Sequence, residues 1–197
     1  LQMKRIMDIV FSLGFILILS PVLLLIAIWI KLDSTGPVFY LQERIGLHRK
    51  PFRIYKFRTM YPDADKRGLL TVGGRDPRVT RAGYYLRKFK LDELPQFFNV
   101  LGGSMSLVGP RPEVKRYVDL YNSTQLNVLN VKPGITDYAS IEYSDENELL
   151  GKAADPERTY IDEIMPAKLE LNLKYINDQG IFTDCKILFR TFLKIVR

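Results

Sequence analysis

Two adjacent acidic residues, Asp92 and Glu93, directly follow the basic residues Arg87, Lys88 and Lys90. An ionised carboxylate can attack phosphorus, a neighbouring carboxylate can help to hold a divalent cation, and nearby cations can neutralise phosphate oxygens. This order of residues predicts a site that handles phosphate groups, with Asp92 and Glu93 as its catalytic pair.

The backbone at Asp92 is expected to begin a helix. Asp92 suits the N-cap position, because a capping carboxylate accepts free backbone N–H groups, and Pro95 needs no such partner in the first turn. The helix dipole and the preceding cations are expected to keep Asp92 ionised. The plainer interpretation is that Asp92 and Glu93 only cap a helix and place favourable charge in its first turn.

Three further cations are candidates for substrate and phosphate binding. Lys56 and Arg58 alternate along a predicted strand, so their side chains share one face. Arg111 lies between Pro110 and Pro112, which fix the backbone on both sides and suit a guanidinium held against a phosphate or a planar base. The alternatives are a solvated edge strand for the first two cations and a rigid turn with a solvent-facing Arg for the third.

Composition limits the class of protein and the kind of metal site. The chain has 197 residues and a net charge of +7, which suits one compact domain plus an appendage. Residues 1–90 hold 17 Lys and Arg against 6 Asp and Glu, whereas residues 91–197 hold 12 against 16. The single Cys185 excludes an intramolecular disulfide and the single His48 argues against a Cys/His site, so an oxygen-ligated metal fits better.

Residues 9–30 contain no charged residue and would be about 33 Å long as a helix, against a hydrocarbon core of roughly 30 Å. They are predicted to enter the membrane. Pro21 lies in the middle, where it removes a backbone N–H and biases Ser20 away from helical geometry. Because positive residues flank both ends, we predict a re-entrant helix–break–helix turned at Ser20 and Pro21, with both ends in the cytoplasm. The alternative is a kinked helix that spans the membrane.

The whole pattern predicts a helix-rich α+β fold with a small β-hairpin or sheet. The membrane hairpin occupies residues 1–36, and a cytoplasmic catalytic domain occupies residues 37–197. Period-two alternation and helix start and stop signals predict the individual elements. Strands are predicted over residues 38–42, 52–60 and 135–141, and helices over residues 82–89, 93–101 and 113–121.

Two further segments have more than one interpretation. Residues 63–77 are rich in Gly, Asp, Lys and Arg, which predicts either a mobile loop that closes over a substrate or a solvated linker. The last helix, about residues 182–197, places Lys186, Arg190 and Lys194 opposite an apolar face. Such a helix is typical of an amphipathic helix at the membrane interface, or of one packed on the protein core.

Several short motifs follow one another along nearly the whole chain. They are Ser20-Pro21, Gln42-Glu43-Arg44-Ile45-Gly46, Tyr55-Lys56-Phe57-Arg58-Thr59-Met60, Leu91-Asp92-Glu93-Leu94-Pro95-Gln96, Ser106-Leu107-Val108-Gly109-Pro110-Arg111-Pro112 and Lys132-Pro133-Gly134-Ile135-Thr136. In type, order and spacing they resemble the bacterial sugar transferase family. These are monotopic phosphoglycosyl transferases, which move a phospho-sugar from a nucleotide diphosphate sugar to polyprenol phosphate.

The resemblance implies a role for each candidate residue. It implies that Asp92 is the nucleophile, that Glu93 helps to hold Mg²⁺ at the diphosphate, and that Arg87 contacts phosphate. It also implies that Ser20 and Pro21 turn the re-entrant helix. The remaining cations fall in family motifs that line the site: Lys56, Arg58 and Arg111.

The resemblance also implies substrates and a location. A UDP-sugar would form a covalent phosphosugar intermediate on Asp92 with release of UMP, and polyprenol (undecaprenyl) phosphate would then accept the phospho-sugar. Membrane lipid is the further partner, no nucleic acid is expected, and the place is the cytoplasmic face of the bacterial inner membrane. The reaction would be the first membrane step of glycoconjugate assembly. Many members have Gly-Trp after Ile135-Thr136, whereas this chain has Asp137-Tyr138-Ala139-Ser140, so the resemblance does not supply the sugar contacts.

Two functions of another class are compatible with the residues alone. Aromatic residues among the cations are typical of a nucleic-acid-binding protein, here one tethered to the membrane. These residues are Tyr55, Phe57, Tyr84, Tyr85 and Phe89. A lipid-binding scaffold without chemistry is the other alternative. Neither one explains the adjacent carboxylates at positions 92 and 93.

Overall fold

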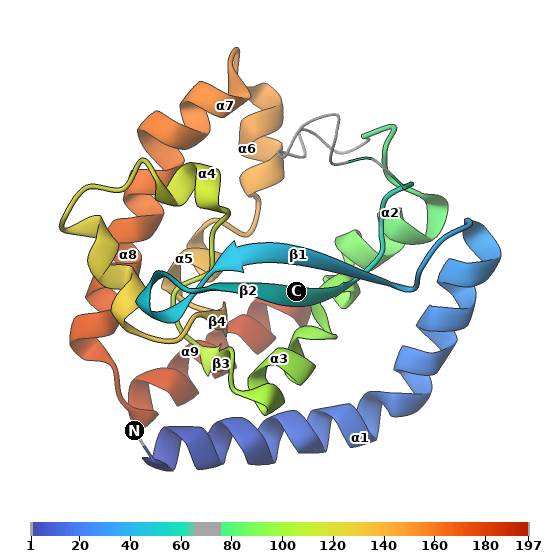
Figure 1. Cartoon of the computed structure of the whole chain (residues 1–197), viewed down its shortest axis with the longest axis horizontal. Helices are drawn as coiled ribbons and strands as arrows, with labels where there is room; N and C mark the ends of the chain where they lie inside the picture. Colours follow the sequence, from blue (N-terminus) through green and yellow to red (C-terminus); the bar gives the residue numbers. More distant parts are fainter. Residues whose placement is uncertain (1, 63, 65–75, 197) are drawn as a thin grey trace.

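The structure is a computed structural model that describes residues 2–62, 64 and 76–196. It has a helix-rich α+β fold, as predicted, with a long apolar N-terminal helix and small sheets. Figure 1 shows this helix along one edge of the molecule, the β-hairpin across the centre and most of the later helices on the opposite side, while the last helix lies near the first. The loop predicted over residues 63–77 lies almost wholly outside the described residues.

The N-terminal helix α1 (Gln2–Asp33) continues without interruption through Ser20 and Pro21. Pro21 has no N–H to offer the carbonyl of Leu17, and the hydroxyl of Ser20 donates to that oxygen instead, at 2.8 Å. Figure 1 shows that the helix bends sharply in its middle. The expected break between two helices is therefore a bend within one continuous helix.

Polar side chains attach the start of α1 to distant parts of the chain. The ammonium of Lys4 pairs with Asp184, which is buried in the last helix α9 (Ile181–Val196), and donates to the carbonyl of Val108 at 3.0 Å. Arg5 donates to the carbonyl of Val100 at 2.6 Å. Both cations, expected only as charges that flank a membrane segment, are thus bonded to the folded domain.

The far end of α1 is attached to the same domain. Arg58 donates to the carbonyl of Ser34 at 2.8 Å and to that of Thr35. Its guanidinium therefore binds carbonyl groups just beyond the C-terminus of the helix. Asp33, the last residue of α1, accepts the backbone N–H of Ala82 at 3.0 Å. Both ends of the apolar helix therefore contact one body of protein.

An antiparallel hairpin supports the centre of the domain. Strand β1 (Phe39–Ile45) pairs with β2 (Pro51–Phe57), in register from Phe39 opposite Phe57 to Ile45 opposite Pro51. The hairpin confirms the first two predicted strands, with shifted ends. Because β2 ends at Phe57, Arg58 follows the strand and lies outside it.

A short parallel pair joins two of the family-like motifs. Strand β3 (Ser106–Val108) pairs with β4 (Gly134–Thr136). A Cβ at Gly134 would lie 2.1 Å from the backbone nitrogen of Gly109, so this crossing requires glycine. The predicted strand over residues 135–141 is wrong beyond Thr136, because Asp137 caps a helix there, α5 (Tyr138–Glu142).

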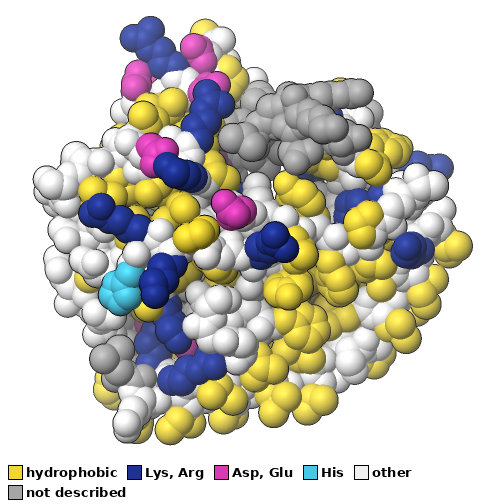
Figure 2. Space-filling model, in the orientation of Figure 1, with side chains coloured by type: hydrophobic (Ala, Val, Ile, Leu, Met, Phe, Trp, Pro, Cys, Tyr) yellow, Lys and Arg dark blue, Asp and Glu magenta, His cyan; other side chains and the backbone are white. Residues whose placement is uncertain are grey.

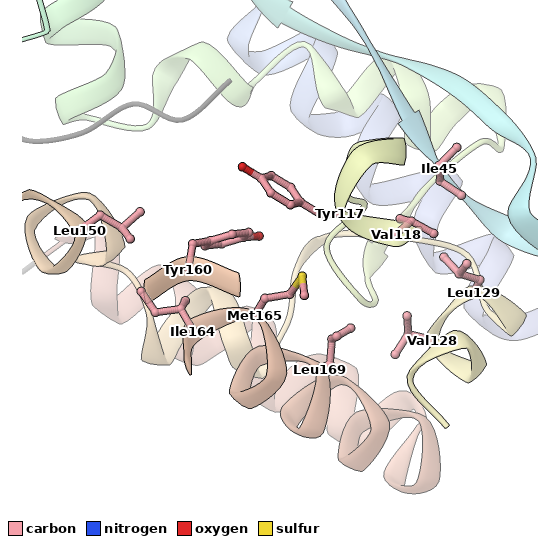
Figure 3. Packing of buried hydrophobic residues seen from close by; sticks show 10 residues of the cluster. All are labelled: Ile45, Tyr117, Val118, Val128, Leu129, Leu150, Tyr160, Ile164, Met165 and Leu169. Carbon is pink, nitrogen blue, oxygen red and sulfur yellow. The ribbon is translucent and has the colours of Figure 1, made fainter. Parts of the chain in front are cut away.

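The other helices surround these strands. They are α2 (Arg81–Lys88), α3 (Gln96–Gly102), α4 (Lys115–Val118), α6 (Glu146–Lys152), α7 (Pro156–Thr159) and α8 (Met165–Asp178). The helix predicted over residues 82–89 is confirmed, the one over 93–101 begins later, and the one over 113–121 is much shorter. Figure 3 shows how Tyr117, Tyr160, Met165 and Leu169 pack into one of the hydrophobic clusters of the core.

Two helices leave apolar surface exposed. On α1, 11% of the most apolar 18-residue window is buried, and among the described residues it is the helix long and apolar enough to cross a membrane. On α9, Ile187 is buried while Phe182, Phe189 and Phe192 are 92%, 62% and 61% exposed. Figure 2 shows hydrophobic side chains gathered along the edge that α1 forms.

Candidate active site

Asp92 and Glu93 lie in a cleft of about 1240 Å³. Three segments bring the candidate residues to it: the end of β2, the turn after α2, and the loop after β3. Of the residues predicted from sequence, the cleft is lined by Lys56, Arg58, Arg87, Asp92, Glu93 and Arg111. The cleft also extends to Phe15 and Leu19 in the middle of α1.

The backbone presents Asp92 in a way that differs from the prediction. Lys90 has a left-handed conformation, with φ 55° and ψ 21°, which ends α2 and turns the chain into a 3₁₀ turn, Leu91–Glu93. Asp92 lies inside this turn and is buried. No hydrogen bond among the described residues reaches its carboxylate, and α3 begins only at Gln96, so the predicted N-cap role of Asp92 is wrong.

Glu93 is held between two cations. Arg111 donates to both of its oxygens, to Oε2 at 3.2 Å and to Oε1, in the forked geometry that suits a carboxylate. The ammonium of Lys56 lies 3.1 Å from Oε1. Burial alone would raise the pKa of Glu93, but the charges and hydrogen bonds of Arg111 and Lys56 outweigh it and hold that pKa well below its usual range. Glu93 is therefore a fixed negative charge.

Asp92 has the opposite electrostatic setting. Burial raises the pKa of Asp92, and the adjacent charge of Glu93 raises it further. The charges of Lys56, Arg87 and Arg111 act in the other direction without cancelling the rise. The sequence predicted that nearby cations keep Asp92 ionised. They do lower its pKa, but not enough to cancel the rise, and two of them, Lys56 and Arg111, are paired with Glu93.

Arg87 reaches the cleft from α2. Its Nε donates to the hydroxyl of Thr59 at 2.9 Å. Helix α2 can lie this close to Thr59 because Gly83 has no side chain, since a Cβ there would be 2.0 Å from the carbonyl oxygen of Thr59. Burial lowers the pKa of Arg87 and the negative charge of Asp92 opposes this, which is consistent with a buried guanidinium near that carboxylate.

Arg58 has a different set of partners from the other candidates. Although it lines the cleft, its guanidinium binds the carbonyls at the end of α1, including that of Ser34. Lys56, by contrast, contacts Glu93 directly. The structure therefore brings Lys56, Glu93 and Arg111 together and uses Arg58 to hold α1.

Two residues that the sequence did not single out fix the position of Arg111. Asp137 accepts the backbone N–H of Arg111 at 3.2 Å. On the other side Arg44 donates to the carbonyl of Pro112 at 3.2 Å and pairs with Glu113 at 2.7 Å. In the sequence, Asp137 was notable only because its segment departs from the family pattern. Arg44 was part of a family-like motif, but no role was predicted for it.

The two carboxylates bear on whether the cleft could hold a metal ion. Among the described residues no group of three or more His, Cys, Asp and Glu side chains could hold an ion by itself. Mg²⁺ usually needs only one or two carboxylates, because substrate phosphates and water supply its other oxygens. Asp92 and Glu93, adjacent and buried in a cleft lined by cations, fit that requirement.

Comparison with known proteins identifies the class to which this fold and cleft belong. The family described as bacterial sugar transferase matches residues 1–197. The chain therefore belongs to the bacterial sugar transferase family.

Individual relatives carry more specific names. One is a UDP-N-acetylgalactosamine-undecaprenyl-phosphate N-acetylgalactosaminephosphotransferase of Aeromonas hydrophila, 40% identical over 98% of this chain and 43% of that protein. Another is a UDP-glucose:undecaprenyl-phosphate glucose-1-phosphate transferase of Escherichia coli (strain K12), 39% identical over 98% of this chain and 40% of that protein. A third, uncharacterized sugar transferase EpsL of Bacillus subtilis (strain 168), is 37% identical over 98% of this chain and 87% of that protein. The chain thus spans about two fifths of the first two relatives.

Proposed function

We propose that this protein transfers a sugar phosphate from a UDP-sugar to a polyprenol phosphate, as the names of its relatives say of them. The observation that carries the proposal is the pair of carboxylates in the cleft. Glu93 is fixed by Lys56 and Arg111, and this leaves the buried Asp92 beside it without a hydrogen-bond partner among the described residues.

In the first step a carboxylate oxygen of Asp92 attacks the β-phosphorus of the UDP-sugar. The bond between that phosphorus and the bridging oxygen breaks, and UMP leaves with the bonding electrons. Arg87 and Arg111 lie where they can neutralise charge on the phosphate oxygens. The product of this step is an acyl phosphate, the mixed anhydride of the Asp92 carboxylate and the sugar phosphate.

In the second step an oxygen of the polyprenol phosphate attacks the same phosphorus, and the carboxylate of Asp92 is released unchanged. This order gives ping-pong kinetics. Mg²⁺ held by Glu93 and the diphosphate oxygens would supply additional charge neutralisation. The raised pKa of Asp92 makes the ionised nucleophile reactive but scarce at low pH.

We also propose a re-entrant membrane segment over residues 1–36 and a catalytic domain over residues 37–197, at the cytoplasmic face of the bacterial inner membrane. The contacts at the two ends of α1 support this arrangement. Lys4 is bonded to the domain at one end and Arg58 binds the other end, so both ends lie on the side of the membrane that holds the domain. Bent in its middle, α1 would reach into the lipid and return.

The last helix suits the same membrane surface. The exposed aromatic residues of α9, with basic residues on a neighbouring stripe, favour an interfacial position. An acceptor phosphate at the interface would then have a path to Asp92, because the cleft runs from Asp92 to Phe15 in α1 and to Phe192 in α9. The lipid tail can stay in the bilayer while its phosphate reacts.

Intact-mass spectrometry tests the covalent step. Incubation of the full chain with a UDP-sugar and Mg²⁺, without acceptor, should add the mass of one phosphosugar, and Asp92→Asn should abolish this adduct. Asp178→Asn, an exposed acidic residue on α8, is the matched control and should keep it. Kinetics that require both substrates to bind before UMP is released, with no adduct, would overturn the proposal.

A further inference from the structure

A second group of polar residues lines the cleft beyond Arg111. They come from α5, α6 and α8, helices for which the sequence motifs predict no role in chemistry. The group consists of Ser140, Glu146, Lys168 and Asn172. In the described part of the chain, none of these four residues forms a hydrogen bond or ion pair with Asp92 or Glu93. Their presence in the same cleft therefore calls for another explanation.

Hydrogen bonds through one carboxylate place Ser140 close to Arg111. Asp137 accepts the backbone N–H of Arg111 with one oxygen, at 3.2 Å, and the backbone N–H of Ser140 with the other, at 2.6 Å. Ser140 therefore lies one carboxylate away from the backbone of the residue that holds Glu93. The charge of Glu93 is the main cause that raises the pKa of Arg111, and the charges of Asp137 and Glu146 raise it further.

The floor of this part of the cleft is one face of α8. Met165, Lys168, Leu169 and Asn172 follow one another at spacings of three or four residues, which places them on the same side of the helix, and all of them line the cleft. Helix α5 packs against α8, as Figure 1 shows, so Ser140 lies on the wall of the same compartment. Figure 3 shows Met165 and Leu169 projecting from this face.

Two oxygens in this compartment lack the partners that buried polar groups normally have. Asn172 is 4% exposed, and its Oδ1 makes no hydrogen bond within the described part of the chain. The buried hydroxyl of Ser140 has none either. An unsatisfied buried oxygen costs about 1–3 kcal/mol, so each one calls for an explanation, and a partner from outside the protein is one such explanation.

The chemistry of the compartment favours a sugar. Lys168 pairs with Glu146 at 2.6 Å, so a donor and an acceptor lie together, and Ser140 and Asn172 can each both donate and accept. Every sugar hydroxyl is also both a donor and an acceptor.

We propose that Ser140 and Asn172, flanked by the Glu146–Lys168 ion pair, form the subsite that binds the hydroxyl groups of the transferred sugar. This inference rests on the proposed function, because it assigns the glycosyl part of the UDP-sugar to one end of that cleft. It makes Asn172 a residue that determines sugar specificity and leaves the diphosphate to the cations around Asp92.

The test compares Asn172→Leu with Asn177→Leu, an exposed Asn on the same helix, in the full chain in lipid nanodiscs. With UDP-glucose and UDP-N-acetylgalactosamine as probes, Asn172→Leu should lower kcat/KM for UMP release by about three- to thirtyfold for the preferred sugar. The dissociation constant of UDP should not change. The melting temperature should stay level or rise, because an unpaired amide is replaced by an apolar group of similar size. Ser140→Ala should act in the same direction.

Two results would overturn the subsite. One is an unchanged kcat/KM for both sugars, and the other is an equal loss of UDP affinity, which would assign the compartment to the nucleotide. If the wild-type chain releases no UMP from either sugar, the proposed function fails, and thermal shifts still test the subsite. A larger shift with a UDP-sugar than with UDP, lost in Asn172→Leu alone, would support it, and equal shifts would reject it.

Discussion

Lys56 donates to Oε1 of Glu93 across 3.1 Å, the same oxygen that Arg111 contacts. The cation of β2 is therefore committed to the second carboxylate of the pair and acts on the first through its field alone. Burial lowers the pKa of Lys56 and the charge of Glu93 opposes that change, so the two groups stabilise each other's ionised forms.

Replacing Lys56 by Met should make the enzyme more sensitive to acid. In the proposed mechanism the ionised carboxylate of Asp92 is the nucleophile, so activity should rise with pH through the pKa of Asp92, which burial has already raised. Removing a positive charge raises that pKa further, and the acidic limb of the kcat/KM profile should move to higher pH. At neutral pH kcat/KM should fall by about a hundredfold. Lys50→Met, at an exposed position, is the control, and a profile displaced toward lower pH would contradict the argument.

Asp92→Asn should stabilise the protein while it abolishes activity. A carboxyl group whose folded pKa is raised destabilises the fold once the pH exceeds its unfolded pKa, and the penalty is complete above the folded pKa. The neutral amide removes this penalty. At this chain length the melting temperature should rise by about 2–4 °C for each kcal/mol of free energy recovered. The gain should vanish as the pH falls below the unfolded pKa. Thermal melts across pH, with Asp178→Asn beside it, measure this, and a lower melting temperature at neutral pH would count against it.

Arg58→Gln should mainly affect stability. Its guanidinium binds carbonyls at the end of α1, and loss of such charge-assisted bonds costs about 2 kcal/mol. The folded fraction should retain its KM for the UDP-sugar, and Arg58→Lys should recover part of the stability. A normal melting temperature combined with a raised KM would show instead that Arg58 contacts phosphate.

Pro21→Ala should weaken the bend of α1. The missing N–H of proline and the clash of its ring with the Leu17 carbonyl together disfavour a straight helix by about 3 kcal/mol. The substitution removes both effects. If α1 then spans the membrane as a straight helix, its first residue should lie outside the cell. In a Cys185→Ser background, Gln2→Cys should then react with a membrane-impermeant maleimide added to intact cells. Leu19→Ala should keep that cysteine protected. Protection in both variants would mean that other contacts fix the topology.

The local elements near the catalytic residues could be predicted from the sequence, because local rules determine them. The apolar run predicted helix at the start of the chain, with an interruption at Pro21 that the structure has as a bend, and alternation predicted the β1–β2 hairpin. The family-like motifs singled out Asp92 and Glu93, and both of them line the cleft.

Long-range contacts could not be predicted in the same way. Asp8 is an isolated acid in an apolar helix, yet it is 2% exposed and accepts the N–H of Leu107, 99 positions away. The predicted Asp92 cap failed because the left-handed Lys90 starts a 3₁₀ turn first. The alternation of residues 135–141 predicted a strand, but Asp137 caps a helix there and the strand ends at Thr136. Each outcome depends on a partner or a backbone conformation that has no local signature.

The ion pair between Lys4 and Asp184 joins residues 180 positions apart. During synthesis the base of the apolar helix is made long before the acid that secures it. The docking of α1 onto the folded domain through this pair must therefore wait until the segment that carries Asp184 has left the ribosome. Until then Lys4 has no carboxylate of α9 to pair with.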